Sequence, residues 1–322
     1  MSNANKHGQT IKSFQAGDKM TIDTALLEKI LPEVEKPARY TGNEWGQYKK
    51  DWEKCHTRLA LLFPDIYEIG MSHLGLKILY DLANQEEGFL AERAFAPWPD
   101  MGELLKKHAV PLYSLETRHA LRDFDLLGFS LQYELSYTNV LYMLELAKIP
   151  FFSSRRDSSY PLLMAGGTCV FNPEPLADFF DFFVLGEGEE VLLEILHVYR
   201  DMKKECTGKE EMLRRLARIK GVYVPSLYKV DYGADGRIAG IKPCEPSVPA
   251  VVQKRIIRNL TNAPYPSCFI VPYLEIIHDR AMVEIMRGCT YGCRLCQAGM
   301  IYRPVREKDE EVIKKQAAEL LR

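Results

Sequence analysis

The chain has 322 residues, of which 47% are hydrophobic and 27% are charged, and its formal net charge is -2. This length predicts about two globular domains, and the near-neutral charge argues against a general binder of polyanions, so nucleic acid is not indicated as a partner. Five of the eight cysteines are scattered and three are clustered, which does not fit a small secreted domain stapled by disulfides. The sequence holds no run approaching the roughly 18 apolar residues of a membrane-spanning helix. We therefore expect a cytoplasmic protein without a membrane partner, in which the polar residues 1–21 form a disordered tail.

The sequence changes in texture near residue 56. Residues 22–55 predict short helices broken by prolines, with Trp45 and Tyr48 docking onto the rest of the chain. Beyond them, short apolar runs alternate with helical patterns, and these runs are Leu59–Phe63, Leu126–Phe129, Leu162–Ala165 and Phe182–Leu185. Runs of four or five apolar residues between helices are typical of parallel strands buried on both faces. Residues 56–205 therefore predict an α/β fold with a doubly wound, flavodoxin-like parallel sheet of about five strands.

A different pattern follows in residues 206–280, which predict a β-rich connector. Lys209–Ile219 reads as an amphipathic helix, and the pair Asp235-Gly236 indicates a β-hairpin because it suits the positive φ of a tight turn. The prolines that follow favour an extended connection. The last segment, residues 281–322, predicts a strand over its first six residues, then a loop, then a helix at Glu310–Leu321.

Three cysteines lie close together in that last loop, namely Cys289, Cys293 and Cys296. Three thiolates on so short a segment can hold an iron–sulfur cluster by three irons and leave the fourth iron open for chemistry. Zinc is an alternative, but its fourth ligand would have to come from His278 or Cys268, neither at a familiar spacing. Three unrelated buried cysteines are a further alternative, which the surrounding arginines and glycines disfavour.

The C-x3-C-x2-C loop after a predicted strand resembles the signature of the radical S-adenosylmethionine (radical SAM) superfamily. More narrowly, residues 287–306 resemble the B12-binding-domain-containing radical SAM proteins. The resemblance implies that Cys289, Cys293 and Cys296 ligate a [4Fe-4S] cluster whose open iron chelates S-adenosylmethionine. One electron would then cleave S-adenosylmethionine to methionine and a 5′-deoxyadenosyl radical, which abstracts hydrogen from an unknown substrate.

The resemblance extends to other residues of the loop and to partners. Gly288 and Gly292 would let the backbone bend around the cluster. Leu295 belongs to the same cluster and S-adenosylmethionine loop, at a position where superfamily members usually carry an aromatic residue. A reductant such as flavodoxin or ferredoxin is implied, and an RNA substrate stays open because related radical SAM enzymes modify RNA.

Loops that follow the predicted strands resemble, in chain order, the D-x-H-x-x-G, S-x-L and G-G elements of cobalamin-binding domains. The candidate cofactor residues in these loops are Asp65, Gly70, Ser130, Gly166 and Gly167. Tyr67 stands in place of the histidine that ligates cobalt, and His73 lies on the following helix. Two alternatives remain at this point. Either cobalamin binds without a protein ligand, or the fold is cobalamin-binding-like, holds no cofactor, and docks substrate or packs against the barrel.

Charged residues near these loops have less specific interpretations. Gly186–Glu190 reads as a capping turn that also resembles the family's G-E-G-E element, because its acidic residues satisfy the helix dipole and would repel phosphate. Arg280 and Glu284 adjoin the predicted strand before the cysteines and could support the cluster or form a structural ion pair. Lys254, Arg255 and Arg258 read as a solvated basic face.

The segment after residue 280 is short for a catalytic domain of this kind. A complete (β/α) barrel takes roughly 200–250 residues, so residues 281–322 suffice only for its first βα unit. We therefore expect an incomplete radical SAM core and the N-terminal portion of a longer enzyme. The alternative is a non-catalytic module that binds a metal or cofactor and mediates an interaction.

Overall fold

The computed structural model describes residues 22–321, and the predicted tail at residues 1–21 lies outside this range. Its centre is a six-stranded sheet with the order β2-β1-β3-β4-β5-β6. The strands are β1 (Thr57–Phe63), β2 (Phe89–Phe95), β3 (Leu126–Ser130), β4 (Leu162–Gly166), β5 (Phe182–Val184) and β6 (Val222–Tyr223). The first five run parallel, and β6 pairs antiparallel with β5. The order 2-1-3-4-5 is that of flavodoxin-like folds, so the predicted doubly wound sheet is confirmed.

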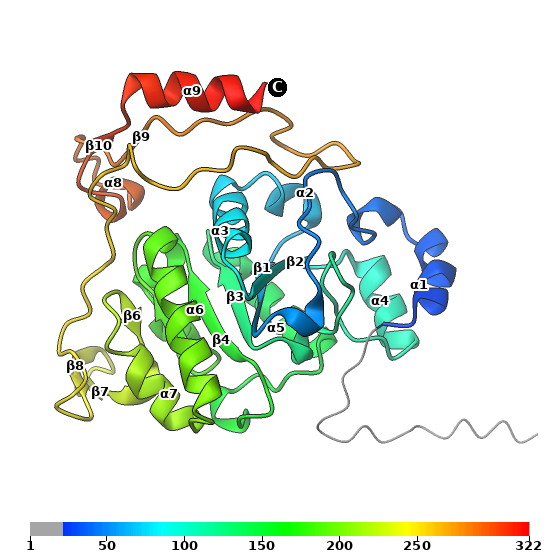
Figure 1. The fold of residues 1–322 in the computed structure, drawn as a ribbon. Helices are drawn as coiled ribbons and strands as arrows, with labels where there is room; N and C mark the ends of the chain where they lie inside the picture. The colour runs from blue at the N-terminus through cyan, green and yellow to red at the C-terminus, as the bar shows by residue number, and fades with distance from the viewer. Residues whose placement is uncertain (1–21, 322) are drawn as a thin grey trace, which may run out of the picture.

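Helices cover both faces of the sheet (Figure 1). The helices between β1 and β6 are α2 (Tyr67–Gly70), α3 (Leu74–Gln85), α4 (Pro99–Lys107), α5 (Tyr137–Leu146), α6 (Gly188–Lys204) and α7 (Lys209–Leu216). Helix α3 packs against α6, and α4 packs against α5. Short 3₁₀ helices η1 to η9 lie at Leu31–Glu33, Pro37–Arg39, Trp52–Lys54, Leu121–Asp123, Glu134–Ser136, Ser153–Arg155, Thr168–Phe171, Glu174–Leu176 and Pro225–Leu227.

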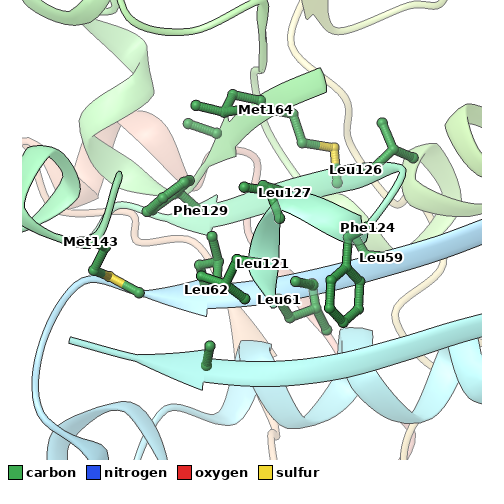
Figure 2. Packing of buried hydrophobic residues seen from close by; sticks show 14 of the residues in the cluster. Leu59, Leu61, Leu62, Leu121, Phe124, Leu126, Leu127, Phe129, Met143 and Met164 are labelled. Atoms are coloured by element: carbon green, nitrogen blue, oxygen red, sulfur yellow. The ribbon is translucent and has the colours of Figure 1, made fainter. Parts of the chain in front are cut away.

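Consecutive side chains along the central strands are buried, which explains their unbroken apolar runs. Leu61 and Leu62 point to opposite faces of β1, yet both are buried. Figure 2 shows Leu127 and Phe129 of the neighbouring β3, and Met164 of β4 beyond it, in the same buried cluster. Burying each such side chain stabilises the fold by roughly 1.5–3 kcal/mol. The sheet is therefore the part of the molecule that apolar burial determines.

Two strands of the sheet carry no clear signal in the sequence. Strand β2 contains Glu92 and Arg93, both fully buried, which interrupt the apolar run. Strand β6 has only two residues. Because β6 pairs with β5, the sheet continues past residue 205, where the pattern of apolar runs predicts the α/β domain to end.

The N-terminal segment packs on the same core as the sheet. Its helix α1 (Thr24–Ile30) is capped by Asp23, whose side chain accepts a hydrogen bond from Ala25 N. Tyr48 docks as predicted and donates a hydrogen bond of 2.8 Å from its hydroxyl to Asp81. The prediction for Trp45 is wrong, since its side chain is 73% exposed and only its backbone pairs, with Val271.

The connector forms the predicted β-hairpin from β7 (Tyr228–Tyr232) and β8 (Ile238–Pro243). After the hairpin the chain runs irregularly back to the other end of the sheet, where the elements from β9 to α9 lie beyond the strands (Figure 1). On the way, the backbone at Arg255 forms a parallel bridge with Gly186, just beyond β5. The segment 244–285 is thereby attached to the α/β domain along its course.

The last segment contains β9 (Met286–Arg287), α8 (Ala298–Ile301), β10 (Arg306–Glu307) and α9 (Glu310–Leu320). The strand predicted at residues 281–286 is reduced to β9, which pairs antiparallel with β10. An antiparallel pair is not the parallel pairing of a barrel, so the predicted barrel unit is not confirmed. Helix α9 forms where predicted, and Asp309 caps it by accepting from Glu311 N at 2.9 Å. No helix within residues 22–321 combines the length and apolarity that crossing a bilayer requires.

Candidate metal and cofactor site

A cavity of about 450 Å³ lies between the carboxyl ends of the strands and the base of the cysteine loop. Apolar side chains of the sheet line one side, including Phe129, Met164 and Val184. Met286 and Tyr302, which flank the cysteine loop, line the other side. Ligands of open α/β sheets bind outside the carboxyl ends of the strands, where the strand order reverses. The cavity occupies this place, beside the reversal between β1 and β3.

The structure separates the five candidate cofactor residues into two groups. Ser130, Gly166 and Gly167 line the cavity. Gly167 has a φ of +108°, and a Cβ there would lie 2.3 Å from Leu131 O, so the backbone requires glycine. These residues come together as the S-x-L and G-G elements predict.

Asp65 and Gly70 do not line the cavity. The carboxylate of Asp65 accepts a hydrogen bond of 2.6 Å from the Tyr133 hydroxyl. A Cβ at Gly70 would lie 2.3 Å from the ring of Phe95, so glycine at this position permits packing of α2 against β2. Asp65 and Gly70 were predicted to line the cavity. In the structure, Asp65 instead accepts a hydrogen bond from Tyr133, and Gly70 permits helix packing.

Tyr67 also faces away from the cavity. Its side chain is buried, and its hydroxyl donates to Glu44 of the N-terminal segment. Burial and the adjacent Glu44 carboxylate raise the pKa of Tyr67. The next residue, Glu68, pairs with Arg39 of the same segment at 2.8 Å. The loop that resembles D-x-H-x-x-G thus binds the N-terminal segment through Tyr67 and Glu68.

His73 lines the cavity, a position that reasoning from the sequence missed. Its Nδ1 accepts a hydrogen bond of 3.1 Å from Leu76 N and so caps α3. Desolvation lowers the pKa of His73 to about 4, so the ring is neutral near pH 7. With Nδ1 accepting, the proton of the neutral ring lies on Nε2, which therefore donates rather than ligates a metal. The sequence did offer one indication of the capping role, because His73 stands directly before an apolar helical pattern.

The cysteine loop is partly exposed. Cys289 and Cys296 are half-buried and Cys293 is exposed. The Sγ of Cys296 accepts from Gly299 N at 3.4 Å. Within residues 22–321, no three His, Cys, Asp or Glu side chains are arranged to hold a metal ion. The loop therefore supplies the predicted thiols without bringing them together in this conformation.

Of the two loop glycines, Gly288 alone has a backbone that requires glycine. Its φ is +91°, and a Cβ would lie 2.6 Å from Pro304 O. Gly292 has no neighbour within 4 Å of such a Cβ, so the bend predicted for it has no steric basis here. The side chain of Leu295 is 95% exposed.

Basic side chains hold the far end of the loop in place. Lys254 donates to Ile301 O at 2.6 Å and to Arg303 O at 2.7 Å. Arg303 in turn donates to Cys289 O at 3.4 Å and Tyr291 O at 3.1 Å. Lys254 is therefore a structural cation, and the interpretation of it as part of a solvated face is wrong.

Ion pairs fasten the base of the loop to the acidic turn before α6. Arg306 Nη1 lies 2.6 Å from the carboxylate of Glu187, and Arg287 donates to Glu189 and, at 2.7 Å, to Glu284. Although burial disfavours its charged form, hydrogen bonds from Arg306 and Ile257 N hold the pKa of Glu187 below its usual value. The interpretation of this turn as a cap alone was incomplete.

The two charged residues singled out before the cysteines behave differently. Glu284 pairs with Arg287 beside the cavity, as a supporting residue would. Arg280 instead lies 3.2 Å from His278 Nδ1 and is exposed. Only Glu284 is therefore placed to influence the cysteine loop directly.

Part of the chain matches a known protein family. Residues 75–225 match the family model described as "Radical SAM proteins, N-terminal". This range ends just after β6 and well before the cysteine loop. The match therefore supports the resemblance to radical SAM proteins independently of the cysteine spacing.

Individual proteins are similar over a larger part of the chain. The uncharacterized protein MJ0966 of Methanocaldococcus jannaschii is 26% identical over 256 residues, covering 79% of this chain and 44% of that protein. A structure of the radical S-adenosylmethionine methyltransferase TsrM from Kitasatospora setae aligns with a TM-score of 0.41 and 13% identity, covering 81% of this chain and 44% of that one. At such values this likeness supports no inference about the site. The chain thus spans less than half the length of each protein.

Proposed function

We propose that this chain belongs to a radical SAM enzyme whose cluster loop is fixed to the wall of a cavity at the carboxyl end of the α/β sheet. The observation that carries the proposal is the position of Met286, Arg287 and Gly288, which lead into the cysteines and line that cavity. The family match upstream of the loop adds independent support.

Three thiols on one loop fit an iron–sulfur cluster by their chemistry, since sulfur is the preferred donor for iron in such clusters. Cys289, Cys293 and Cys296 would be the ligands. When bound, the [4Fe-4S] cluster would supply one electron to S-adenosylmethionine, whose cleavage starts radical chemistry. A flavodoxin or ferredoxin would serve as its reductant.

The residues of the chain itself would confine and orient what enters the cavity. Phe129, Met164 and Val184 present an apolar wall, which excludes water from a reactive intermediate. Lys254 and Arg303 hold the carbonyl groups of the loop and so fix its path above this wall. The substrate class stays open, including RNA.

Cobalamin ligated by the protein does not fit this site. Tyr67, at the position of the ligating histidine, is turned away and bonded to Glu44, and His73 Nδ1 is occupied by Leu76 N. On adding cob(II)alamin to the full chain, the electron paramagnetic resonance (EPR) spectrum should show no nitrogen coupling from a protein imidazole. Such a coupling would contradict the assignment of Tyr67.

Anaerobic reconstitution tests the proposed function. The wild-type chain should turn brown and take up about four irons. Cys293→Ala should abolish this uptake, whereas Cys268→Ala, which removes an exposed cysteine outside the loop, should leave it unchanged. Bound zinc without a cluster signal would favour the alternative of a non-catalytic metal-binding module.

A further inference from the structure

The turn before α6 is the point at which three distant segments meet. Glu187 accepts hydrogen bonds from Ile257 N at 2.5 Å and from Arg306 at 2.6 Å, and its other oxygen lies 3.6 Å from Arg287. Arg306 also donates to Ile257 O at 2.7 Å. One carboxylate therefore joins the α/β domain, the connector and both flanks of the cysteine loop.

The charged groups at this point are well shielded from water. The exposed fraction of the side chain is 9% for Glu187, 7% for Glu189, 8% for Arg306 and 11% for Arg287. We call these four residues, together with Glu284, the acidic clamp. Burying such charges costs desolvation free energy that their pairing offsets only in part, so the clamp is a poor device for stability alone. Its arrangement does favour one position of the loop over others.

The alternation of glycine and glutamate gives the clamp its geometry. Gly186 has a φ of +103°, and a Cβ there would lie 2.2 Å from Arg255 O, so only glycine lets the connector approach this closely. A Cβ at Gly188 would lie 3.2 Å from Leu79 on α3, which is a tight contact. Gly186 thus brings the connector backbone close and Gly188 makes room for Leu79, while Glu187 and Glu189 project toward Arg287 and Arg306.

Glu190 shows that helix capping does not require this arrangement. It also lies in the first turn of α6, but it is exposed and pairs with Arg255 at the surface. Glu190 satisfies the helix dipole from there, whereas Glu187 and Glu189 are buried against the arginines that flank the cysteines.

We propose that Glu187 and Glu189 are positioning residues for the cysteine loop, a role that rests on the proposed function. By holding Arg287 before the first cysteine and Arg306 after the last, they fix both ends of the loop over the cavity. They touch neither thiol nor substrate and act through the two arginines. Residues that orient metal ligands from outside typically change metal affinity by roughly 10- to 100-fold when substituted.

Iron release from the reconstituted full chain tests the proposal. Glu187→Gln should speed iron loss to a chelator by roughly 10- to 100-fold and alter the EPR spectrum of the reduced cluster with S-adenosylmethionine bound. Arg306→Gln should reproduce both effects from the other side of the pair. Asp181→Asn is the matched control, because Asp181 forms a buried pair with Arg156 at the amino end of β5, away from the cavity. It should lower thermal stability and leave iron release and the spectrum unchanged.

Hydrogen exchange of the iron-free chain tests the positioning role without requiring a bound cluster, so its outcome is independent of the proposed function. Glu187→Gln should increase exchange of backbone amides in residues 286–307 beyond any change in β3 and β4. Unchanged exchange there, or iron release no faster than in Asp181→Asn, would overturn the positioning role. A wild-type chain that takes up no iron would instead reject the proposed function, and the exchange measurement would still decide whether the clamp holds the loop.

Discussion

All seven residues of β2 are buried, whereas none of the eleven residues of α9 is. In the α/β domain, side chains cover both faces of the sheet, and this burial fixes the positions of the strands. The cysteine-loop region has few buried side chains and is held by hydrogen bonds and ion pairs to the domain beneath it. The α/β domain therefore folds by apolar packing, whereas hydrogen bonds and ion pairs hold the cysteine-loop region in position against it.

Truncating a core side chain of the α/β domain should have the largest effect on the free energy of unfolding. Leu127 in β3 is fully buried, and Leu127→Ala should lower the free energy of unfolding by about 2–5 kcal/mol. Ile313→Ala on α9, whose side chain is only partly covered, should cost less than about 1 kcal/mol. Urea denaturation measures both. Equal losses would mean that α9 belongs to the same packed core.

The buried carboxylate of β2 should make the α/β domain sensitive to pH. Burial, together with the neighbouring Glu116, raises the pKa of Glu92 to about 7 from an ordinary 4.5. The folded state then binds more protons than the unfolded state between these values, so stability should fall as the pH rises from 4.5 to 7. Glu92→Gln should remove this fall, which is on the order of 3 kcal/mol. Thermal unfolding of both proteins at pH 5 and pH 8 tests the sign, and a wild type more stable at pH 8 would contradict it.

Two tyrosine hydroxyls offer a matched pair of smaller changes. Tyr67 donates to the buried Glu44, and Tyr133 donates to Asp65 near the surface. Tyr67→Phe leaves a buried carboxylate oxygen without its donor and should cost about 1.5–3 kcal/mol. Tyr133→Phe should cost less than about 0.5 kcal/mol because water can replace the hydroxyl. Chemical denaturation distinguishes them, and a reversed order would mean that the N-terminal segment is not docked through Tyr67.

The smallest effect is expected within the cysteine loop. Gly288→Ala should strain a backbone with φ of +91°, at a local cost of about 1 kcal/mol, and Gly292→Ala should be neutral. Hydrogen exchange in residues 286–307 should rise for the first variant only. An equal response of the two would mean that the loop bends at both glycines.

Local patterns made much of the α/β domain predictable from the sequence. Strands β1, β3, β4 and β5 have unbroken apolar runs, and the hairpin turn and the Asp309 cap depend on neighbouring residues only. Strand β2 was missed because Glu92 and Arg93 read as surface residues, although ion pairs and hydrogen bonds from distant segments allow them to be buried.

The candidate site was less predictable because its contacts join residues far apart in the chain. Arg287 and Glu189 are separated by 98 positions, and nothing in either local pattern indicates the other. The cysteine spacing predicted the metal ligands, which stay a prediction. The sequence shows that Tyr67 replaces the histidine. It does not show which way the Tyr67 side chain points, because that depends on the distant Glu44.

The return of the connector to the sheet has a consequence for the continuity of the chain. The hairpin tip at Gly236 is open, while residues on both sides of the hairpin are attached to the α/β domain, through β6 before it and Arg255 after it. A protease that nicks this tip would leave two polypeptides that still migrate as one particle in gel filtration. Covalent linkage between the halves is then dispensable once folding is complete.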